Sequence, residues 1–272
     1  MRHVMEALGK AKVVVEDGKV VYVGEPKIKY CPLFFKHRGI KEIDKEEIKK
    51  NIEFRIKDFG LFTKDRKVLE DKYIVPFGAS EIIMSALKRK VVDVAVIVSD
   101  CAGTVITSNP YLVQGLCGRI SGIVETSPIK EVIDKIEKAG GIVLDKEAKI
   151  NQVEGVKKAK SLGYKKIIVT VTNLEDAKKC KELGAITFGV HTTGIEWDED
   201  INKYFDLITA CASKCLREKL KVKAQIGKTI PIFALSQIGK EILLERAKDL
   251  DNILITIEDL PKLSSDQPKP LI

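Results

Sequence analysis

Residues 128–171 read PIKEVIDKIEKAGGIVLDKEAKINQVEGVKKAKSLGYKKIIVTV and predict a helix, a strand, a second helix and a second strand in succession. In the first helix, 128–139, Ser127 is expected as the N-cap and Pro128 as the first helical residue. Its apolar residues recur at the spacing of one helix face, namely Ile129, Val132, Ile133 and Ile136. The second strand, 166–171, is almost entirely apolar, as in a strand covered on both faces. The stretch therefore predicts an α/β protein.

The same alternation extends to both sides of this stretch. The predicted strands are 91–98, 142–144, 166–171, 185–190, 205–209, 230–235 and 252–257. The predicted helices are 79–90, 128–139, 152–162, 174–183, 198–203, 211–219 and 237–249, with Asn173 as one N-cap. This pattern favours an α/β fold with an open, mostly parallel, doubly wound sheet and helices on both faces.

The first 72 residues have a different pattern. In VVVEDGKVVYV, residues 13–23, two β-branched runs flank Asp17-Gly18, which predicts a β-hairpin. A polar helix is expected over 44–51. We therefore predict three parts: an N-terminal hairpin-bearing subdomain over 1–72, an α/β domain over 73–260 and a frayed tail over 261–272.

The composition excludes several classes of protein. The chain of 272 residues is 44% hydrophobic, which is too apolar for a disordered chain. No apolar run reaches the ~20 residues of a membrane span. The formal charge of +8 is spread over interleaved acidic and basic residues, without the basic stripe and aromatics of a nucleic-acid binder. We therefore expect neither a membrane nor a nucleic-acid partner.

The N-terminus, MRHVMEALGKAKVVV, lacks the apolar core of a signal peptide, so we expect a cytoplasmic protein. Thiols stay reduced in that compartment, and the six Cys are then free thiols, metal ligands or catalytic groups. Abundant Lys and Glu with scarce Gln and Asn is a thermophile-like composition.

Candidate site residues follow from the predicted sheet, because ligands of an open α/β sheet bind beyond the carboxyl ends of its strands. The segments in that position are rich in small, hydroxylated and titratable residues: 99–104, 125–127, 172–173, 191–194, 210–213 and 236–237. Their hydroxyl groups also suit helix caps. The less ordinary members are Asp100, Cys101, His191 and Cys211, because capping requires neither His nor Cys.

His191 follows an apolar strand and precedes a Thr-Thr-Gly turn. A neutral imidazole at this position suits acid–base catalysis or metal binding, and we predict that His191 and Asp100 exchange protons. The alternative is a half-buried His that hydrogen-bonds a loop carbonyl.

Cys211 and Cys215 lie four residues apart on a predicted helix and therefore share a face. This spacing fits two ligands of a metal or iron–sulfur cluster, and Cys31, on a loop before Pro32, is the third candidate ligand. Two alternatives stay open. Cys211 at a helix N-terminus is a reactive thiolate, because that position lowers a thiol pKa, or the Cys residues only pack.

The glycine-rich stretch QGLCGRISG, residues 114–122, is a candidate anion-binding loop. Backbone N–H groups and a guanidinium suit a phosphate or carboxylate. The predicted anion-binding residues are Gly115, Gly118, Arg119 and Ser121, with Thr104 and Thr192 from strand ends. The spacing matches no known phosphate-loop motif, and turns with tight packing are the alternative explanation.

Several strings together resemble one archaeal family: EALGKAKVVVEDGKVVYVGEP, YCPLF, FGASEIIMSAL, AGTVITSNPYLVQG, GRISG, VHTTGI and ITACASKCLRE. They are similar to the methanogenesis marker protein 8 family, which occurs in methanogens and has no assigned reaction. The resemblance covers about residues 1–240 and implies a methanogen cytoplasm and a link to methane metabolism. It supplies no catalytic residues. Cys101 and Cys117 stand where the family pattern has Gly, which leaves Cys31 and Cys211 as the better thiol candidates.

The leading hypothesis is an enzyme or maturation factor of methanogenic metabolism that binds an anionic small molecule at the strand ends. Arg119 and the stretch 115–122 would hold the anion, His191 and Asp100 would exchange protons, and Cys211 or Cys31 would be nucleophile or ligand. The alternative is a non-catalytic protein that carries an iron–sulfur cluster or docks on a methanogenic reductase complex. A ligand-binding regulator is a third interpretation, and a homodimer is a further expected assembly.

Overall fold

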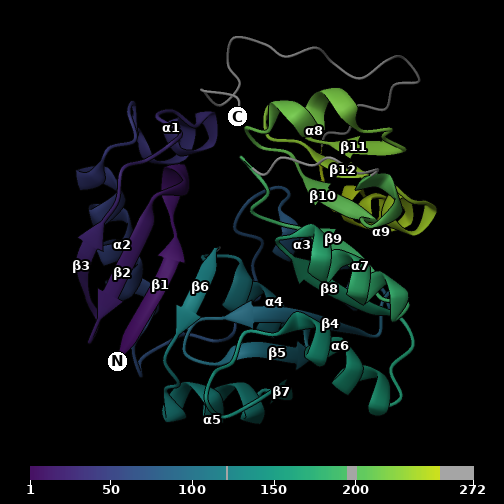
Figure 1. Ribbon diagram of the computed structural model, residues 1–272, viewed down its shortest axis with the longest axis horizontal. Coiled ribbons are helices and arrows are strands. Elements are labelled where there is room, and N and C mark those ends of the chain that lie inside the picture. Colours follow the sequence, from purple (N-terminus) through teal and green to yellow (C-terminus); the bar gives the residue numbers. More distant parts are fainter. Residues whose placement is uncertain (121, 195–200, 252–272) are drawn as a thin grey trace.

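The computed structural model describes residues 1–120, 122–194 and 201–251, which form two sheets (Figure 1). The smaller sheet is antiparallel, with the strand order β3-β2-β1-β6: β3 (Lys19–Val23), β2 (Lys12–Glu16), β1 (Arg2–Glu6) and β6 (Ile123–Thr126). The hairpin predicted at Asp17-Gly18 is confirmed. Both turn residues have positive φ, 47° and 75°, the conformation of the two-residue turn that suits twisted strands.

The division predicted at residue 72 stays a prediction. The smaller sheet is not built from the first 72 residues alone, because its fourth strand is residues 123–126. Two helices accompany the sheet, α1 (Pro32–Arg38) and α2 (Lys45–Phe59), and a short 3-10 helix, η1 (Leu8–Lys10), follows β1. α2 begins at its N-cap Asp44 and is longer than predicted. Its buried residues Ile48 and Ile52 pack with Val13 and Val15 of β2, which gives the smaller sheet its own apolar core.

The larger sheet has the strand order β11-β12-β10-β9-β8-β4-β5-β7. Its strands are β4 (Val94–Ser99), β5 (Gly103–Thr107), β7 (Gly141–Val143), β8 (Ile167–Val171), β9 (Ile186–Gly189), β10 (Leu207–Thr209), β11 (Ala224–Ile226) and β12 (Ile232–Ala234). The centre, β4-β8-β9-β10, is parallel, and every strand pair outside it is antiparallel.

The fold is therefore mixed α/β, and the prediction of a mostly parallel sheet is wrong in its extent. The cause at one edge is a tight turn. Only residues 100–102 separate β4 from β5, and a parallel neighbour needs a crossover of about a dozen residues. Cys101 and Gly103, both at positive φ, reverse the chain there, whereas the sequence analysis treated 99–104 as a loop at a strand end.

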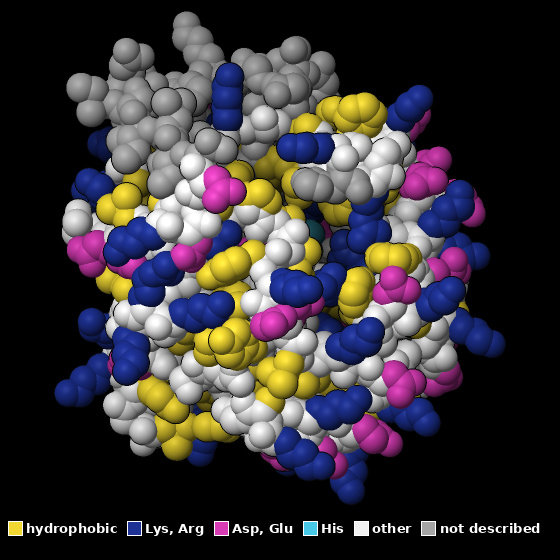
Figure 2. Space-filling model, turned by 180° about the vertical axis from the view of Figure 1, so that it is seen from behind, with side chains coloured by type: hydrophobic (Ala, Val, Ile, Leu, Met, Phe, Trp, Pro, Cys, Tyr) yellow, Lys and Arg dark blue, Asp and Glu magenta, His cyan; other side chains and the backbone are white. Residues whose placement is uncertain are grey.

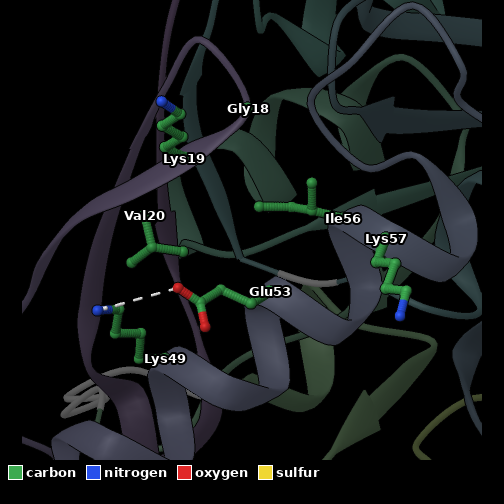
Figure 3. Close-up of a pocket in the computed structure, with 7 residues that line it drawn as sticks. All are labelled: Gly18, Lys19, Val20, Lys49, Glu53, Ile56 and Lys57. Carbon is green, nitrogen blue, oxygen red and sulfur yellow. Dashed lines mark ion pairs between the residues drawn. The ribbon is translucent and has the colours of Figure 1, made fainter.

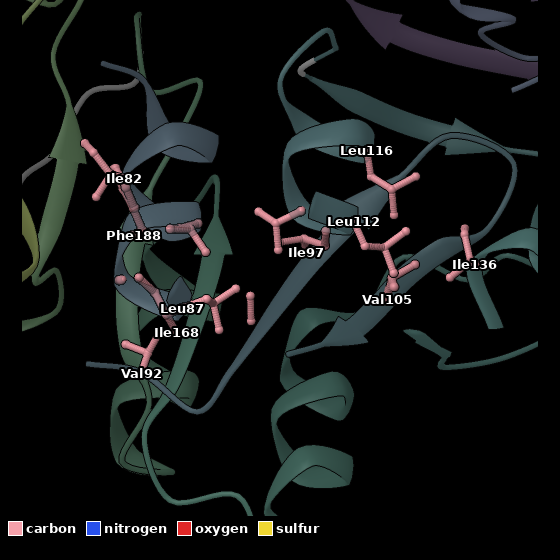
Figure 4. Packing of buried hydrophobic residues seen from close by; sticks show 14 of the residues in the cluster. Ile82, Leu87, Val92, Ile97, Val105, Leu112, Leu116, Ile136, Ile168 and Phe188 are labelled. Carbon is pink, nitrogen blue, oxygen red and sulfur yellow. The ribbon is translucent and has the colours of Figure 1, made fainter. Parts of the chain in front are cut away.

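Helices cover both faces of the larger sheet, as predicted. One face packs against α3 (Ala79–Lys88), α4 (Pro110–Cys117), α5 (Lys130–Lys138) and α9 (Gln237–Ala247), and Figure 4 shows part of this core. The other face packs against α6 (Gln152–Ser161), α7 (Leu174–Glu182) and α8 (Lys214–Lys219). In Figure 4, Ile97 and Val105 of neighbouring strands point towards Leu112 and Leu116 of α4. Within the described residues, no helix is long and apolar enough to cross a membrane.

Several element boundaries differ from the predictions. α5 begins at Lys130 after the N-cap Ile129, because Ser127 instead hydrogen-bonds the backbone of Arg2 across the smaller sheet. α8 begins at Lys214 rather than at residue 211. The predicted helix 198–203 overlaps a 3-10 turn, η2 (Ile201–Lys203), and its first half lies outside the described residues, as do the predicted strand 252–257 and the tail.

Candidate functional site

The loops that follow β9 and β10 lie side by side, because these strands are parallel neighbours. Thr192 Oγ1 donates a hydrogen bond of 2.5 Å to the carbonyl of Thr209, so the predicted anion ligand Thr192 joins the two loops. The backbone N–H of Ala212 donates to Thr193 Oγ1 at 3.4 Å. The loop of His191 is thereby held against the loop of Cys211.

Cys211 meets Cys31 across the two parts of the molecule. Cys31 is the N-cap residue of α1 and is buried, and its thiol lies close enough to the thiol of Cys211 for each to change the acidity of the other. α1 and α8 accordingly lie at the same end of the molecule in Figure 1. The structure thus brings together two thiols that are 180 residues apart in sequence, and both are free.

The environment makes the two thiols unequal. The contact with Cys211 lowers the pKa of Cys31 to about 7, against the opposing effect of burial, and the backbone N–H groups of Phe34 and Leu33 contribute to this decrease. The contact with Cys31 and burial raise the pKa of Cys211 well above its ordinary value, although Arg217 opposes this shift. Cys31 is therefore the more acidic thiol of the pair and ionises first, whereas Cys211 stays protonated.

His191 pairs with a carboxylate from the smaller sheet rather than with Asp100. Its Nε2 lies 2.8 Å from Oε1 of Glu6, at the end of β1. Lys10 Nζ lies 3.3 Å from the same oxygen and donates a hydrogen bond of 2.5 Å to the carbonyl of Thr193. A Cβ at Gly122 would lie 2.9 Å from Nε2 of His191, so glycine permits the close approach of this backbone.

These contacts change the acidity of Glu6. Burial alone would raise the pKa of Glu6, but the contacts with His191 and Lys10 outweigh burial, and the pKa lies below its ordinary value. Glu6 is therefore a carboxylate beside the imidazole. Such a pair holds the imidazole ring in one orientation, as acid–base chemistry requires.

Asp100 is placed in a structural ion pair. It is fully buried, and its carboxylate accepts hydrogen bonds from Arg66 Nε at 3.0 and 3.2 Å and from the backbone N–H of Phe62 at 3.0 Å. Arg66 is itself buried and also donates to the carbonyls of Lys67 and Leu116. The prediction that Asp100 exchanges protons with His191 does not fit these partners, because Asp100 is occupied by Arg66.

The glycine-rich stretch is not an open loop. Gly115 lies inside α4, where a Cβ would overlap the carbonyl of Val68, so close packing explains this glycine. The backbone N–H of Gly118 donates to Gln114 within the same helix end and is not available to an anion. Ser121 lies outside the described residues. Thr104 is fully buried, and its hydroxyl accepts a hydrogen bond from the backbone N–H of Asn151.

Arg119 is still a candidate for binding an anion. Its guanidinium lies 3.9 Å from the centre of the Phe59 ring and 2.5 Å from Glu70 Oε2. Arg38 and Arg55 lie close enough for all three arginines to repel one another electrostatically. Arg38 and Arg55 were not predicted, since they lie on separate helices and no local motif marks them.

The structure does not unite the three predicted cysteine ligands. Cys211 precedes α8, whereas Cys215 lies on the helix and packs against the apolar core on that face of the sheet. Among the residues that the structure describes, no group of three or more His, Cys, Asp and Glu side chains could hold a metal ion. Burial raises the pKa of Cys117 and Cys180 to about 12 and that of Cys101 well above its ordinary value, so these thiols stay protonated.

A surface hollow lies away from these groups. It has a volume of about 340 Å³ between the β2–β3 hairpin and α2, and Figure 3 shows Val20 and Ile56 on opposite sides of it. Its lining contains no predicted site residue. Figure 2, which views the molecule from behind relative to Figure 1, shows Lys and Arg side chains interleaved with Asp and Glu over the described surface.

Comparison with known proteins identifies the lineage. The family model described as "Uncharacterized protein conserved in archaea (DUF2099)" matches residues 3–248. The chain belongs to this archaeal family. It is 77% identical over 279 residues to "Uncharacterized protein MJ0054" of Methanocaldococcus jannaschii, an alignment that covers 100% of this chain and 99% of the relative. No solved structure matches the chain.

Glu6 and Lys10, like Arg38 and Arg55, are residues of the candidate sites that the sequence did not reveal. Both belong to the N-terminal string EALGK, which was assigned only to the region before the hairpin. Lys10 has a positive φ of 58°, which is uncommon for a side chain of this kind. The only sequence signal is the adjacent Gly9, at φ 68°, which marks the turn between β1 and β2.

Proposed function

We propose that this family member is a thiol-dependent enzyme in which Cys31 and Cys211 cycle between a dithiol and a disulfide. The observation that carries the proposal is the proximity of the two thiols, which lowers the pKa of Cys31 and raises that of Cys211. A low-pKa thiolate beside a second, protonated thiol is the arrangement that thiol–disulfide exchange uses.

The chemistry balances with a disulfide substrate as the oxidant. The Cys31 thiolate attacks one sulfur of the substrate, a mixed disulfide forms, the substrate S–S bond breaks, and the first substrate thiolate leaves. Cys211 then loses its proton to solvent and attacks the Cys31 sulfur, which forms the Cys31–Cys211 disulfide and releases the second substrate thiolate. A cellular dithiol returns the pair to the reduced state, so the substrate is reduced by two electrons in each cycle.

The charge around the thiols favours an anionic small molecule as substrate. Arg217 lies beside Cys211, where its guanidinium donates to the carbonyls of Ala210, Cys211 and Thr229. Lys10 adds a second cation on the adjoining loop. Arg217 and Lys10 would stabilise a departing thiolate by their positive charge. The His191–Glu6 pair would stabilise it by proton transfer.

The resemblance to the methanogenesis marker protein 8 family supports a place for this reaction in methane metabolism. The close relative from M. jannaschii agrees with such a setting, because that organism is a methanogen. A cluster-carrying assembly protein is the competing proposal, in which the same two thiols bind iron together with ligands from another source.

The first experiment is equilibration of the purified protein in glutathione redox buffers, followed by alkylation of the remaining thiols and peptide mass spectrometry. A Cys31–Cys211 disulfide should form reversibly, and the Cys215→Ala control should form it to the same extent. If neither thiol becomes oxidised at any buffer ratio while the protein stays folded, the redox proposal fails. Iron and acid-labile sulfide near one equivalent per chain or more, after anaerobic purification, would favour the cluster protein instead.

A second experiment addresses His191. Its φ of 57° suits Asn as a replacement, because Asn tolerates this conformation better than most residues. His191→Asn should slow turnover of an anionic disulfide with dithiothreitol by about a hundredfold, the usual contribution of a positioned acid or base, and should leave the disulfide equilibrium unchanged. Undiminished turnover would remove His191 from the mechanism.

A further inference from the structure

Three arginine side chains converge on the C-terminal half of α2. Arg38 ends α1, and its guanidinium lies 4.7 Å from the centre of the Phe54 ring. Arg119 follows α4 and lies 3.9 Å from the centre of the Phe59 ring. The two rings contact each other edge to face at 5.8 Å, so α2 presents one continuous aromatic support for two cations from different elements.

Arg55, on α2 between these two rings in sequence, completes the cluster. It is half-buried, and its Nη1 donates to the backbone carbonyl of Arg119, which ties α2 to the end of α4. We refer to Arg38, Arg55 and Arg119 as the arginine cluster. Guanidinium groups have a fixed fork of donors that matches an oxyanion, and stacking on an aromatic ring holds such a fork in place without using its donors.

Negative charge in the structure does not balance this cluster. Arg119 is paired with Glu70, and Asp58 is the carboxylate that acts on Arg38. Within the described ranges, Arg55 has no carboxylate within ion-pair distance. Burial lowers the pKa of Arg55 to about 10, and the charges of Arg38 and Arg119 lower it further in the same direction. A half-buried cation beside two others raises the free energy of the fold unless an anion binds there.

We infer that the arginine cluster is a binding site for an oxyanion of the phosphate class. Arg55 and Arg119 supply half-buried guanidinium groups, and Arg38, which is exposed, leaves the site open to solvent. The Nε and Nη2 groups of Arg55 make no hydrogen bond within the described residues, so these donors are left for the ligand, whereas Nη1 is used by the Arg119 carbonyl. The inference does not depend on the thiol chemistry, since it involves neither Cys31 nor Cys211.

Calorimetric titration with inorganic phosphate, at constant ionic strength set by sodium chloride, tests this site. The wild-type chain should bind one phosphate, and Arg55→Gln should weaken binding at least about tenfold, the usual effect of losing one charge-assisted contact. Arg2→Gln is the matched control, because Arg2 pairs with Glu125 at the surface of the smaller sheet, and it should bind as the wild type does. Cys31→Ser should also retain binding, which separates this site from the thiol pair.

Thermal unfolding provides a second measurement that does not need tight binding. Without phosphate, Arg55→Gln should melt at the same temperature as the wild type or higher, because one repelling charge is gone. With phosphate, only the wild type should gain stability. Arg38→Gln, at an exposed position, gives the same comparison if Arg55→Gln fails to fold. Stabilisation that chloride reproduces at equal ionic strength, or that both variants retain, would overturn the inference.

The probe also distinguishes the source of the oxyanion. Glycerol 3-phosphate that binds more tightly than inorganic phosphate would indicate that the natural ligand is a phosphate monoester. Equal binding of the two would indicate that the site recognises the phosphate group alone. Either result requires the same loss in Arg55→Gln.

Discussion

The carboxyl end of β4 and the carboxyl ends of β9 and β10 lie on one edge of the same sheet, yet the residues that follow these strands have different partners. At β4, the N-terminal part of the chain supplies Arg66, which closes the end with a buried ion pair to Asp100. At β9 and β10, it supplies Glu6 and Cys31, which leave a carboxylate beside His191 and a thiol beside Cys211.

This difference shows that a strand end provides a position but not a chemistry. Asp100 and His191 satisfy the same sequence rule. Arg66, which is permanently charged, pairs with Asp100 and leaves its carboxylate unavailable for catalysis. At the other end, the partners are a carboxylate beside His191 and, beside Cys211, the thiol of Cys31, whose pKa is lowered to about 7.

The largest expected effect is on stability, at the carboxyl end of β4, which we call the closed end because Arg66 and Asp100 form a buried ion pair there. Arg66→Met should lower the free energy of unfolding by about 3–5 kcal/mol, because it leaves Asp100 charged, buried and unpaired. The double variant with Asp100→Leu should recover most of that loss. Urea denaturation at pH 7 measures both.

The exposed pair of Arg2 and Glu125 serves as the control for that variant. Arg2→Met should cost less than about 1 kcal/mol, as exposed ion pairs usually do. Equal, small losses in Arg66→Met and Arg2→Met would contradict the view that the β4 end depends on its ion pair.

The second prediction concerns the carboxyl ends of β9 and β10, which we call the reactive end because Cys211 and His191 follow them. In Cys211→Ala, the pKa of Cys31 should rise from about 7 towards the ordinary thiol value of about 8.5, because its main stabilising contact is lost. Alkylation of Cys31 by iodoacetamide at pH 7 should slow about tenfold. The rate measured from pH 6 to pH 10 gives the midpoint directly, and Cys215→Ala should leave it unchanged. A midpoint that does not move in Cys211→Ala would show that Cys211 does not activate Cys31.

A third prediction concerns the loss of stability at acid pH, and the residue responsible, His3, lies near the closed end. His3 is buried there, with Nδ1 2.7 Å from Thr126 Oγ1, and burial lowers the pKa of His3 to about 4. Because the unfolded chain binds this proton from about pH 6.5, stability should fall as the pH decreases from about 6.5 to 4. At pH 4.5 the loss due to His3 should be about 2–3 kcal/mol.

His3→Leu tests this account of acid sensitivity. The variant should lose less free energy of unfolding between pH 7 and pH 4.5 than the wild type does, when both are measured by urea denaturation. If both proteins show the same pH dependence, the acid sensitivity lies elsewhere.

The smallest expected effect is at the reactive end. Glu6→Gln should cost about 1 kcal/mol at pH 7, since its ion pairs with His191 and Lys10 are partly exposed. The folded-state pKa of Glu6 is lowered, so this contribution is present above the unfolded-state pKa and disappears as the pH falls through the folded-state value. Glu125→Gln is the matched control. A cost that persists unchanged at pH 3 would show that the effect is not electrostatic.

Part of the site was predictable because it depends on the sheet alone. His191 and Cys211 were selected as residues that follow apolar strands, and the parallel pairing of β9 and β10 brings their loops together. The same rule failed for the glycine-rich stretch. Glycine at residue 115 serves close packing of α4 on Val68, and no periodicity distinguishes packing from ligand binding.

The sequence by itself determined the local elements: the hairpin at Asp17-Gly18, the helix that follows Asn173 and the alternation of helices with apolar strands. These depend on turn conformation, capping and hydrophobic period, which act over a few residues. Only the tertiary structure decided which groups meet. Lys10 and Thr193 are 183 residues apart, and Cys31 and Cys211 are 180 apart. Their contacts arise because η1 and α1, beside the smaller sheet, lie against the loops that follow β9 and β10, and no local energy specifies that arrangement.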